Sequence, residues 1–213
     1  MALHNNCSGK HAGFICASHH LGEKVEGYIK PDHPAQRETK DILEGFYDFN
    51  LDNQAQTGTD GCSIPTYAVP LKNLALGFAK FAAKNTGSAK RDKAIGQIHD
   101  ACVSHPDLVA GTRRFDTVIM EAFGKAVLVK TGAEGVYAGS VPSLGLGIAL
   151  KCEDGTTRAS EAMMAVCLAA FLKEQPASLE RYLDLELKNR NGWKVGSVKA
   201  VDGLFAKLSE AVA

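Results

Sequence analysis

The sequence predicts an α+β fold in which helices flank an antiparallel sheet. Helical periodicity dominates the chain up to residue 123, and three short β-branched or Gly-punctuated runs follow at 125–130, 136–141 and 145–152. Helices and strands that are segregated along the chain are typical of α+β proteins. Three or four strands form a small sheet, and 213 residues suffice for one buried core. We therefore expect a single domain over residues 1–213.

The helices are predicted from apolar residues at helical spacing. Residues 8–21 begin after a dense polar segment, with Ser8 as a suitable N-cap and Gly22 as the stop. Residues 34–49 carry Pro34 in their first turn, where proline is favourable. Further helices are predicted at 70–84, 92–104, 114–123, 158–174 and 178–186, with a helical tail closing the chain.

Three segments between these helices are predicted without helical structure. Residues 50–65, NLDNQAQTGTDGCSIP, are polar and Gly-rich, and a loop of this length is often functional. Residues 106–111 predict a turn, and 193–201 predict a last strand.

The composition argues against nucleic-acid and membrane binding. Lys and Arg number 24 and Asp and Glu number 24, so the basic excess of an anion-binding surface is missing. No apolar run approaches the roughly 20 residues of a membrane span. The first residues do not resemble a secretory signal, so a cytoplasmic location is expected. The six cysteines are not spaced like a small disulfide framework.

Two segments carry the residues most suited to chemistry. Cys7 precedes a predicted helix and Lys10 lies in its first turn, so both side chains reach one region at the helix start. A helix N-terminus favours a thiolate, which is both a nucleophile and a zinc ligand. The long loop adds Asp60 and Cys62, with Gly61 between them.

Each of these residues also has a structural interpretation. Cys7 is otherwise an ordinary helix-start residue, and His11 a hydrogen-bonded helix residue. Asp60, followed by Gly61, is typical of turn chemistry.

Six blocks of unusual composition run in order from Leu3 to Ala200. They are LHNNCSGKHAGF, EGYIKPDHPAQ, DGCSIPTYAVPL, LVAGTRRFDT, KTGAEGVYAGSVPSLGLGIALKCEDGTTRA and NGWKVGSVKA. Taken together, these blocks resemble the asparaginase II family, the zinc-binding bacterial and fungal asparaginases. The resemblance implies a fold similar to serine β-lactamases and glutaminases, and hydrolysis of L-asparagine to aspartate and ammonia.

The resemblance also implies a zinc site made by Cys7, Lys10 and Cys62. Three protein ligands leave a fourth position on tetrahedral zinc for water or substrate. A lysine binds metal only when deprotonated, and burial with a neighbouring cation would lower the pKa of Lys10 to allow this.

The same resemblance assigns roles to residues in the second half of the chain. Lys130, in Lys130-Thr131-Gly132, resembles the strand lysine that faces the nucleophile in β-lactamase relatives. Lys130, Asp60 and His11 are therefore the catalytic candidates. The substrate-binding candidates are Thr112, Arg114 and Gly132, and Asp116 in the same GTRRFD block is a further pocket-lining candidate.

The chain departs from the family pattern in one respect. Family members carry a Ser-x-x-Lys nucleophile pair in an N-terminal portion, and neither Ser-x-x-Lys nor Thr-x-x-Lys occurs here. We therefore expect the N-terminal part of the family fold to be missing, leaving an open sheet edge that favours a homodimer. The alternatives are a non-catalytic zinc-binding homologue or subunit, and a cysteine hydrolase with Cys7 as nucleophile and His11 or Lys10 as base.

Overall fold

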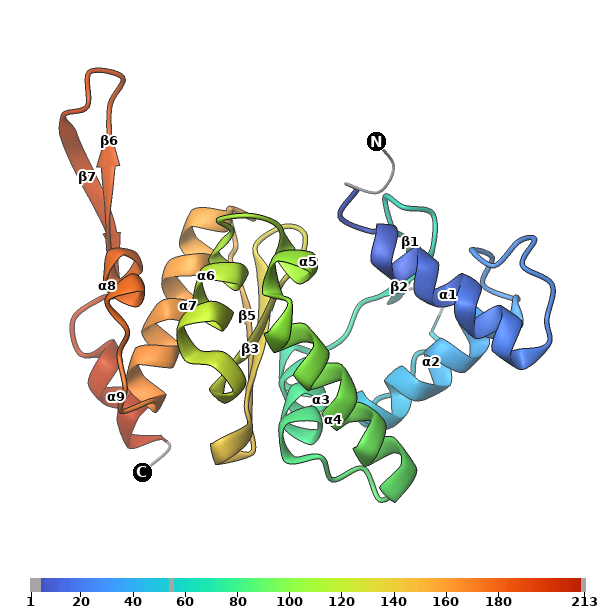
Figure 1. Ribbon diagram of the computed structural model, residues 1–213. Helices are drawn as coiled ribbons and strands as arrows, with labels where there is room; N and C mark the ends of the chain where they lie inside the picture. The colour runs from blue at the N-terminus through green and yellow to red at the C-terminus, as the bar shows by residue number, and fades with distance from the viewer. Residues whose placement is uncertain (1–4, 54–55, 212–213) are drawn as a thin grey trace. The chain divides into compact units, whose positions relative to one another are not determined.

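The structure, a computed structural model, describes residues 5–53 and 56–211 (Figure 1). Its contacts divide the chain into two compact units, Met1–Gly77 and Phe78–Ala213. The single-domain expectation stays a prediction. Outside the described residues lie the first two residues of the LHNNCSGKHAGF block, positions 54–55 of the predicted long loop and the last two residues of the tail.

The first unit combines helices with a short hairpin. Its elements are α1 (Ser8–Leu21), α2 (Pro34–Tyr47), β1 (Thr57–Thr59), β2 (Pro65–Tyr67) and the start of α3 (Leu71–Ala83). β1 and β2 pair antiparallel, with Thr59 opposite Pro65. The hairpin therefore turns through residues 60–64, in the middle of the DGCSIP segment.

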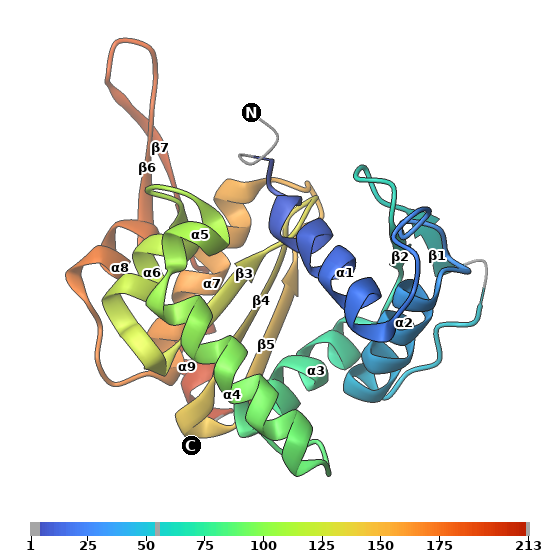
Figure 2. The same cartoon turned by 45° about the vertical axis from the view of Figure 1, so that its right-hand side comes forward.

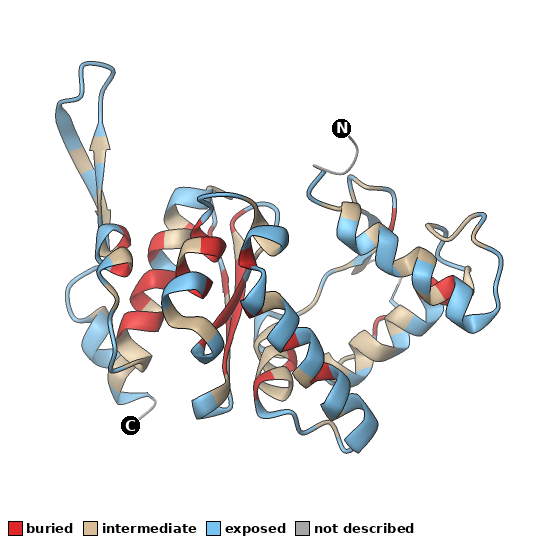
Figure 3. Cartoon of the chain, viewed as in Figure 1, coloured by how far each residue is buried: buried red, intermediate tan, exposed pale blue. Residues whose placement is uncertain are grey.

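Packing in the first unit is closest where α2 meets α3. A side chain at Gly77 would approach Tyr47 Cδ1 to 2.8 Å, so only glycine fits there without movement. The Asn73 side chain donates to the Tyr47 carbonyl over 2.9 Å, which satisfies a backbone acceptor at the end of α2. Most side chains of this unit are half-buried or exposed (Figure 3).

The second unit is built around a three-stranded antiparallel sheet of order β3-β4-β5 (Figure 2). Its strands are β3 (Leu128–Thr131), β4 (Val136–Val141) and β5 (Leu146–Lys151), and the register pairs Thr131 with Tyr137. The helices before the sheet are the end of α3, α4 (Ala89–Ser104), α5 (Pro106–Ala110) and α6 (Phe115–Phe123), and the 3-10 turns are Gly124–Ala126 and Pro142–Leu144.

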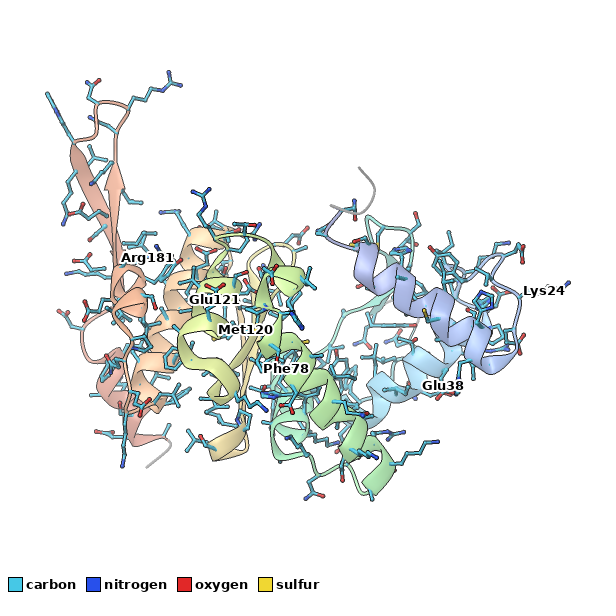
Figure 4. The ribbon with its side chains drawn as sticks, viewed as in Figure 1. Lys24, Glu38, Phe78, Met120, Glu121 and Arg181 are labelled. Atoms are coloured by element: carbon cyan, nitrogen blue, oxygen red, sulfur yellow. The ribbon has the colours of Figure 1, made fainter. Side chains whose placement is uncertain are left out.

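The hydrophobic core lies between the sheet and its helices. α7 (Thr157–Phe171) lies along β4 and β5, α6 lies against β3, and Figure 1 shows both helices on one side of the sheet. Ile119, Val129 and Leu168 are completely buried in this layer. Met120 is also buried, whereas its neighbour Glu121 is exposed, so α6 turns one face to the core (Figure 4).

A second hairpin follows the core elements. α8 (Ala177–Leu183) leads into β6 (Asp184–Lys188), which pairs antiparallel with β7 (Lys194–Lys199), and α9 (Leu204–Glu210) ends the described chain. This hairpin is a sheet of its own and projects from the second unit (Figure 1).

The predicted α+β class agrees with this mixture of helices and small antiparallel sheets. The helix over 8–21 is confirmed, although its N-cap is Cys7 and not Ser8, which is the first helical residue. The helix predicted over 34–49 ends at Tyr47, since Asp48 adopts a left-handed conformation that a helix cannot continue.

Other predictions were wrong in an instructive way. The loop 50–65 contains β1 and the start of β2, strands too short to show an alternating pattern. The turn at 106–111 is the short helix α5, begun by Pro106. The helix predicted over 178–186 ends at Leu183 and gives way to strand β6. No helix in the described ranges has the length and apolar character needed to cross a bilayer.

Candidate metal centre

The loop at the tip of the first hairpin brings Asp60 and Cys62 together. Asp60 N donates to Ile64 O over 2.9 Å and Ser63 N donates back to Asp60 O over 2.8 Å, which closes a tight turn. Asp60 Oδ1 also accepts from Gly61 N over 2.8 Å. The buried Ile64 anchors the turn in the first unit. Asp60 Oδ2 takes no part in the turn and contacts Cys62 and Lys10.

The start of α1 supplies the other two groups. Cys7 is the N-cap residue, with no hydrogen bond from its side chain to the helix. Its backbone N–H donates to Asn5 Oδ1 over 2.9 Å, so Asn5 fixes the chain just before the helix. Lys10 lies three residues further on, in the first turn. The sequence therefore orients both side chains by local structure alone.

These groups meet at one point of the first unit. Metal-ligating atoms of Cys7, Asp60 and Cys62 all lie within 4.8 Å of one another. Asp60 Oδ2 accepts from Cys62 Sγ over 3.1 Å and pairs with Lys10 Nζ at 3.2 Å. Among the described residues, this is the group of His, Cys, Asp and Glu side chains gathered closely enough to hold an ion.

The electrostatics of the cluster favour a carboxylate between a thiol and an ammonium group. The hydrogen bonds from Cys62, Lys10 and Gly61 N lower the pKa of Asp60. Partial burial and the hydrogen bond to Asp60 raise the pKa of the Cys62 thiol. In this state Asp60 is the negative centre of the cluster and Cys62 is a thiol donor.

Lys10 differs from the sequence expectation. Partial burial acts to lower its pKa, but the hydrogen bond to Asp60 and the neighbouring Cys62 outweigh burial and raise it. The expected lowering of the pKa of Lys10 is therefore not seen in the metal-free chain. A neighbouring anion stabilises the ammonium form, whereas the expectation assumed a neighbouring cation.

The donor set suits a zinc ion. Thiolate sulfur and carboxylate oxygen are both favoured zinc ligands, and an amine nitrogen can bind the same ion once it has lost its proton. Cys7, Cys62 and Lys10 would bind after losing their protons, so metal affinity would rise with pH. Asp60 lies in the same cluster, and a carboxylate there would fix a ligand through a hydrogen bond or bind the ion itself.

His11, a catalytic candidate, lies one turn into α1 and is engaged by another partner. Its Nδ1 is 2.7 Å from Tyr28 OH, and the Tyr28 ring packs edge-on against the imidazole. Its Nε2 is buried with no hydrogen-bond partner among the described residues. The structural interpretation, a hydrogen-bonded helix residue, describes His11 in this structure.

The remaining candidates belong to the second unit. Lys130 is exposed near the end of β3, and its Nζ donates to Thr131 O over 2.7 Å. Gly132 follows, and its N–H donates to Val136 O over 2.8 Å. Thr112 and Arg114 are exposed in the loop before α6, where Arg114 is the N-cap residue. The structure thus gathers these residues around β3 and the start of α6.

Asp116, the further pocket-lining candidate, lies in the interior of the second unit. It is completely buried, and its carboxylate accepts from Thr131 N over 2.7 Å and from the hydroxyl of Tyr137. Tyr137 is a further residue that sequence reasoning missed. The sequence did carry one signal for this interaction, a carboxylate in the first turn of a strongly apolar helix. A charge buried at such a position needs hydrogen-bond partners.

Comparison with known proteins gives one family. The family model described as L-asparaginase II matches residues 1–200 of the chain. A search of curated proteins finds no match.

Proposed function

We propose that this protein, which belongs to the L-asparaginase II family, is a zinc-binding amidohydrolase that converts L-asparagine to aspartate and ammonia. Family membership indicates an asparaginase-type hydrolase. The proposal adds the substrate, the metal and the roles of individual residues. The β-lactamase and glutaminase-like fold and the cytoplasmic location stay predictions.

The observation that carries the metal proposal is the cluster of Cys7, Asp60 and Cys62. Its ligating atoms lie within 4.8 Å of one another although residues 7 and 62 are far apart in sequence. Lys10 joins the cluster through its ion pair with Asp60. Free cysteines are ordinarily buried as small apolar residues. Two cysteines beside a carboxylate and an ammonium group are therefore better explained as metal ligands than as core residues.

We assign the ligand role to Cys7, Lys10 and Cys62, with Asp60 as the carboxylate that orients them. A bound zinc ion would supply Lewis-acid polarisation of a substrate carbonyl or fix the substrate's position. Asp60 holds Lys10 and Cys62 in place through Oδ2 while Gly61 N–H holds Oδ1. The carboxylate is thereby fixed on both oxygens.

We assign substrate recognition and proton transfer to the second unit. The exposed guanidinium of Arg114 suits the α-carboxylate of an amino acid, which it would bind through paired hydrogen bonds. The amine of Lys130 is exposed and donates to the backbone carbonyl of Thr131, so its protons can exchange with a reacting group. Thr112 and Gly132 would complete the binding surface.

The direct test is ammonia release from L-asparagine by the full chain, loaded with zinc. We expect release by the wild type and a loss of about 100-fold in Cys62→Ser, since removing even outer-shell partners of a metal commonly costs 10–100-fold. Cys16→Ser is the matched control, because Cys16 is an exposed thiol of α1. No release by the zinc-loaded wild type, or equal rates in both variants, would contradict the proposal.

A non-catalytic zinc-binding homologue is the second candidate. The observation that favours it is the cluster itself, since Cys7, Asp60 and Cys62 would hold an ion whether or not the protein hydrolyses an amide. The same experiment separates the two functions. Zinc bound by the wild type but lost in Cys62→Ser, without ammonia release, would identify this second function. The cysteine hydrolase is less favoured, since Lys10 and His11 are engaged by Asp60 and Tyr28.

A further inference from the structure

The strand that carries Lys130 is held by an unusual acceptor. The order β3-β4-β5 places β3 at an edge of its sheet. At such an edge, backbone N–H groups that do not face the neighbouring strand need another partner. Thr131 N–H, next to Lys130, donates over 2.7 Å to Asp116 Oδ1 on α6. A side-chain carboxylate therefore takes the place of a neighbouring strand.

The second oxygen of the same carboxylate holds the next strand. Asp116 Oδ2 accepts from the hydroxyl of Tyr137, and Tyr137 is the residue paired with Thr131 across β3 and β4. Asp116 and Tyr137 are both completely buried. One buried carboxylate thus binds both members of a cross-strand pair.

Tyr137 is fixed as a neutral donor to this carboxylate. Burial and the charge of Asp116 raise the pKa of its hydroxyl far above the ordinary value. Its ring packs edge-on against Phe115, with ring centroids 5.5 Å apart. Because ring and hydroxyl are both held, Tyr137 in turn restrains Asp116.

Gly132 is fixed from the opposite side of β3. Its N–H donates to Val136 O over 2.8 Å, and a Cβ at this position would lie 3.1 Å from Val136 Cβ. The peptide groups after Lys130 are therefore anchored in turn to α6 and to β4. The Lys130 side chain itself is exposed, and its amine is held to this backbone by its hydrogen bond to Thr131 O.

We propose that Asp116 is a positioning residue that sets the place of the Lys130 amine by accepting the Thr131 N–H. This inference rests on the proposed function in giving Lys130 a catalytic role, but the positioning is a property of the second unit alone. Asp116 is buried beneath the strand, so it acts through Thr131 and Lys130 and not on the substrate.

The test measures the amine of Lys130 directly. The intact chain is treated with a limiting amount of an N-hydroxysuccinimide ester, and acylation of Lys130 is compared by mass spectrometry with that of Lys207, an exposed lysine of α9. In Asp116→Ala we expect Lys130 to react about fivefold faster, because its amine is no longer held at Thr131 O. This factor corresponds to the loss of one hydrogen bond. The reactivity of Lys207 should not change.

Two variants separate positioning from general packing. Asp116→Asn keeps an acceptor oxygen for Thr131 N–H, so Lys130 should stay within about twofold of the wild type. Tyr137→Phe removes the other hydrogen bond and leaves the one to Thr131, so its effect should also be small. An unchanged Lys130 in folded Asp116→Ala, or an equal rise at Lys130 and Lys207, would overturn the proposal.

Two further measurements cover the other outcomes. If Asp116→Ala does not fold, amide exchange in the wild type decides: the Thr131 amide should be protected, and exchange as fast as in an exposed loop would overturn the proposal. Where the wild type releases ammonia, Asp116→Ala should lower kcat but have no added effect in a Lys130→Ala background. A wild type that hydrolyses no asparagine would refute the proposed function, while the acylation result would still decide the positioning role.

Discussion

At the scale of single residues, Asp60 links the turn to the candidate metal centre. One oxygen accepts from Gly61 N–H and the other from Cys62 and Lys10. The sequence placed Asp60 between turn chemistry and catalysis as alternatives. The structure shows that the turn uses one carboxylate oxygen and that the other contacts Cys62 and Lys10, while the catalytic role of Asp60 stays a prediction.

Asp60→Asn tests this arrangement. Loss of the negative charge removes the ion pair with Lys10, and we expect zinc affinity to fall about 10–100-fold, the range for groups that orient metal ligands. Isothermal titration of the metal-free chain with zinc measures the change. Asp41→Asn, an equal charge change on the exposed face of α2, should leave the affinity as it is. Equal affinities in the two variants would remove Asp60 from the site.

A buried histidine makes the second unit sensitive to acid. His99 on α4 is 3% exposed; its Nδ1 has only a long contact, 3.5 Å, with Asp100 Oδ1, and its Nε2 has no hydrogen-bond partner among the described residues. Burial lowers its pKa from the ordinary 6.5. The unfolded chain therefore takes up a proton at a higher pH than the folded chain. Stability is unaffected well above pH 6.5 and falls as the pH drops through that value.

His99→Leu should remove this pH dependence. Because it removes a buried ring nitrogen without a partner, Nε2, and only one long contact, that of Nδ1 with Asp100, the free energy of unfolding at neutral pH should change by no more than about 1 kcal/mol. At pH about 5 the variant should be more stable than the wild type. Urea unfolding at both pH values measures this, with His105→Gln at the exposed end of α4 as control. A wild type equally stable at both values would show that His99 titrates normally.

At the scale of elements, strong periodicity was predictable and short strands were not. The apolar residues of α3, α6 and α7 located those helices to within a few residues. Helix α1 has no apolar stripe, and it was located by its polar start and by the stop at Gly22. Strand β4 was predicted at its observed bounds. Strand β6 was missed, since Leu185 and Leu187 alternate with polar residues that also favour helices. Strands β1 and β2 are too short to show the alternation of apolar and polar residues that predicts a strand.

Gly135 shows how a turn fixes the sheet of the second unit. Its φ is +71°, and an added Cβ would lie 2.9 Å from Cys152 Cβ and 3.0 Å from the Gly155 carbonyl carbon. Gly135→Ala should lower the free energy of unfolding by about 2–4 kcal/mol, through left-handed strain and overpacking together. Gly145 has φ +57° and an open surrounding, so Gly145→Ala should cost only about 1 kcal/mol. Equal losses in urea unfolding would contradict the close approach.

At the scale of the whole molecule, the candidate residues fall into the two compact units. Cys7, Lys10, His11, Asp60 and Cys62 belong to the first, and Lys130, Thr112, Arg114 and Gly132 belong to the second. Residue chemistry alone drew attention to the candidates of the first unit, whereas the resemblance supplied the zinc assignment and the candidates of the second unit. The partners of Asp116 were not predictable, because its contact with Thr131 and Tyr137 depends on how α6 lies on β3.

This division predicts where zinc stabilises the chain. A ligand stabilises the structure that binds it, by about 2.7 kcal/mol at 100 times its dissociation constant. Zinc should therefore slow amide exchange in residues 5–11 and 58–66 of the wild type but not in Cys62→Ser. Residues 128–151 of the second unit should exchange alike with and without zinc. An equal slowing in both segments would contradict the assignment of all metal ligands to the first unit.

The central claim is that two sulfur atoms and one amine of this chain bind a single zinc ion. X-ray absorption at the zinc edge of the protein loaded with one equivalent tests it most directly. We predict two sulfur neighbours at about 2.3 Å and one nitrogen at about 2.0–2.1 Å, with a light atom in the remaining position. A first shell of oxygen and nitrogen atoms without sulfur, or an unchanged spectrum in Cys62→Ser, would contradict the account.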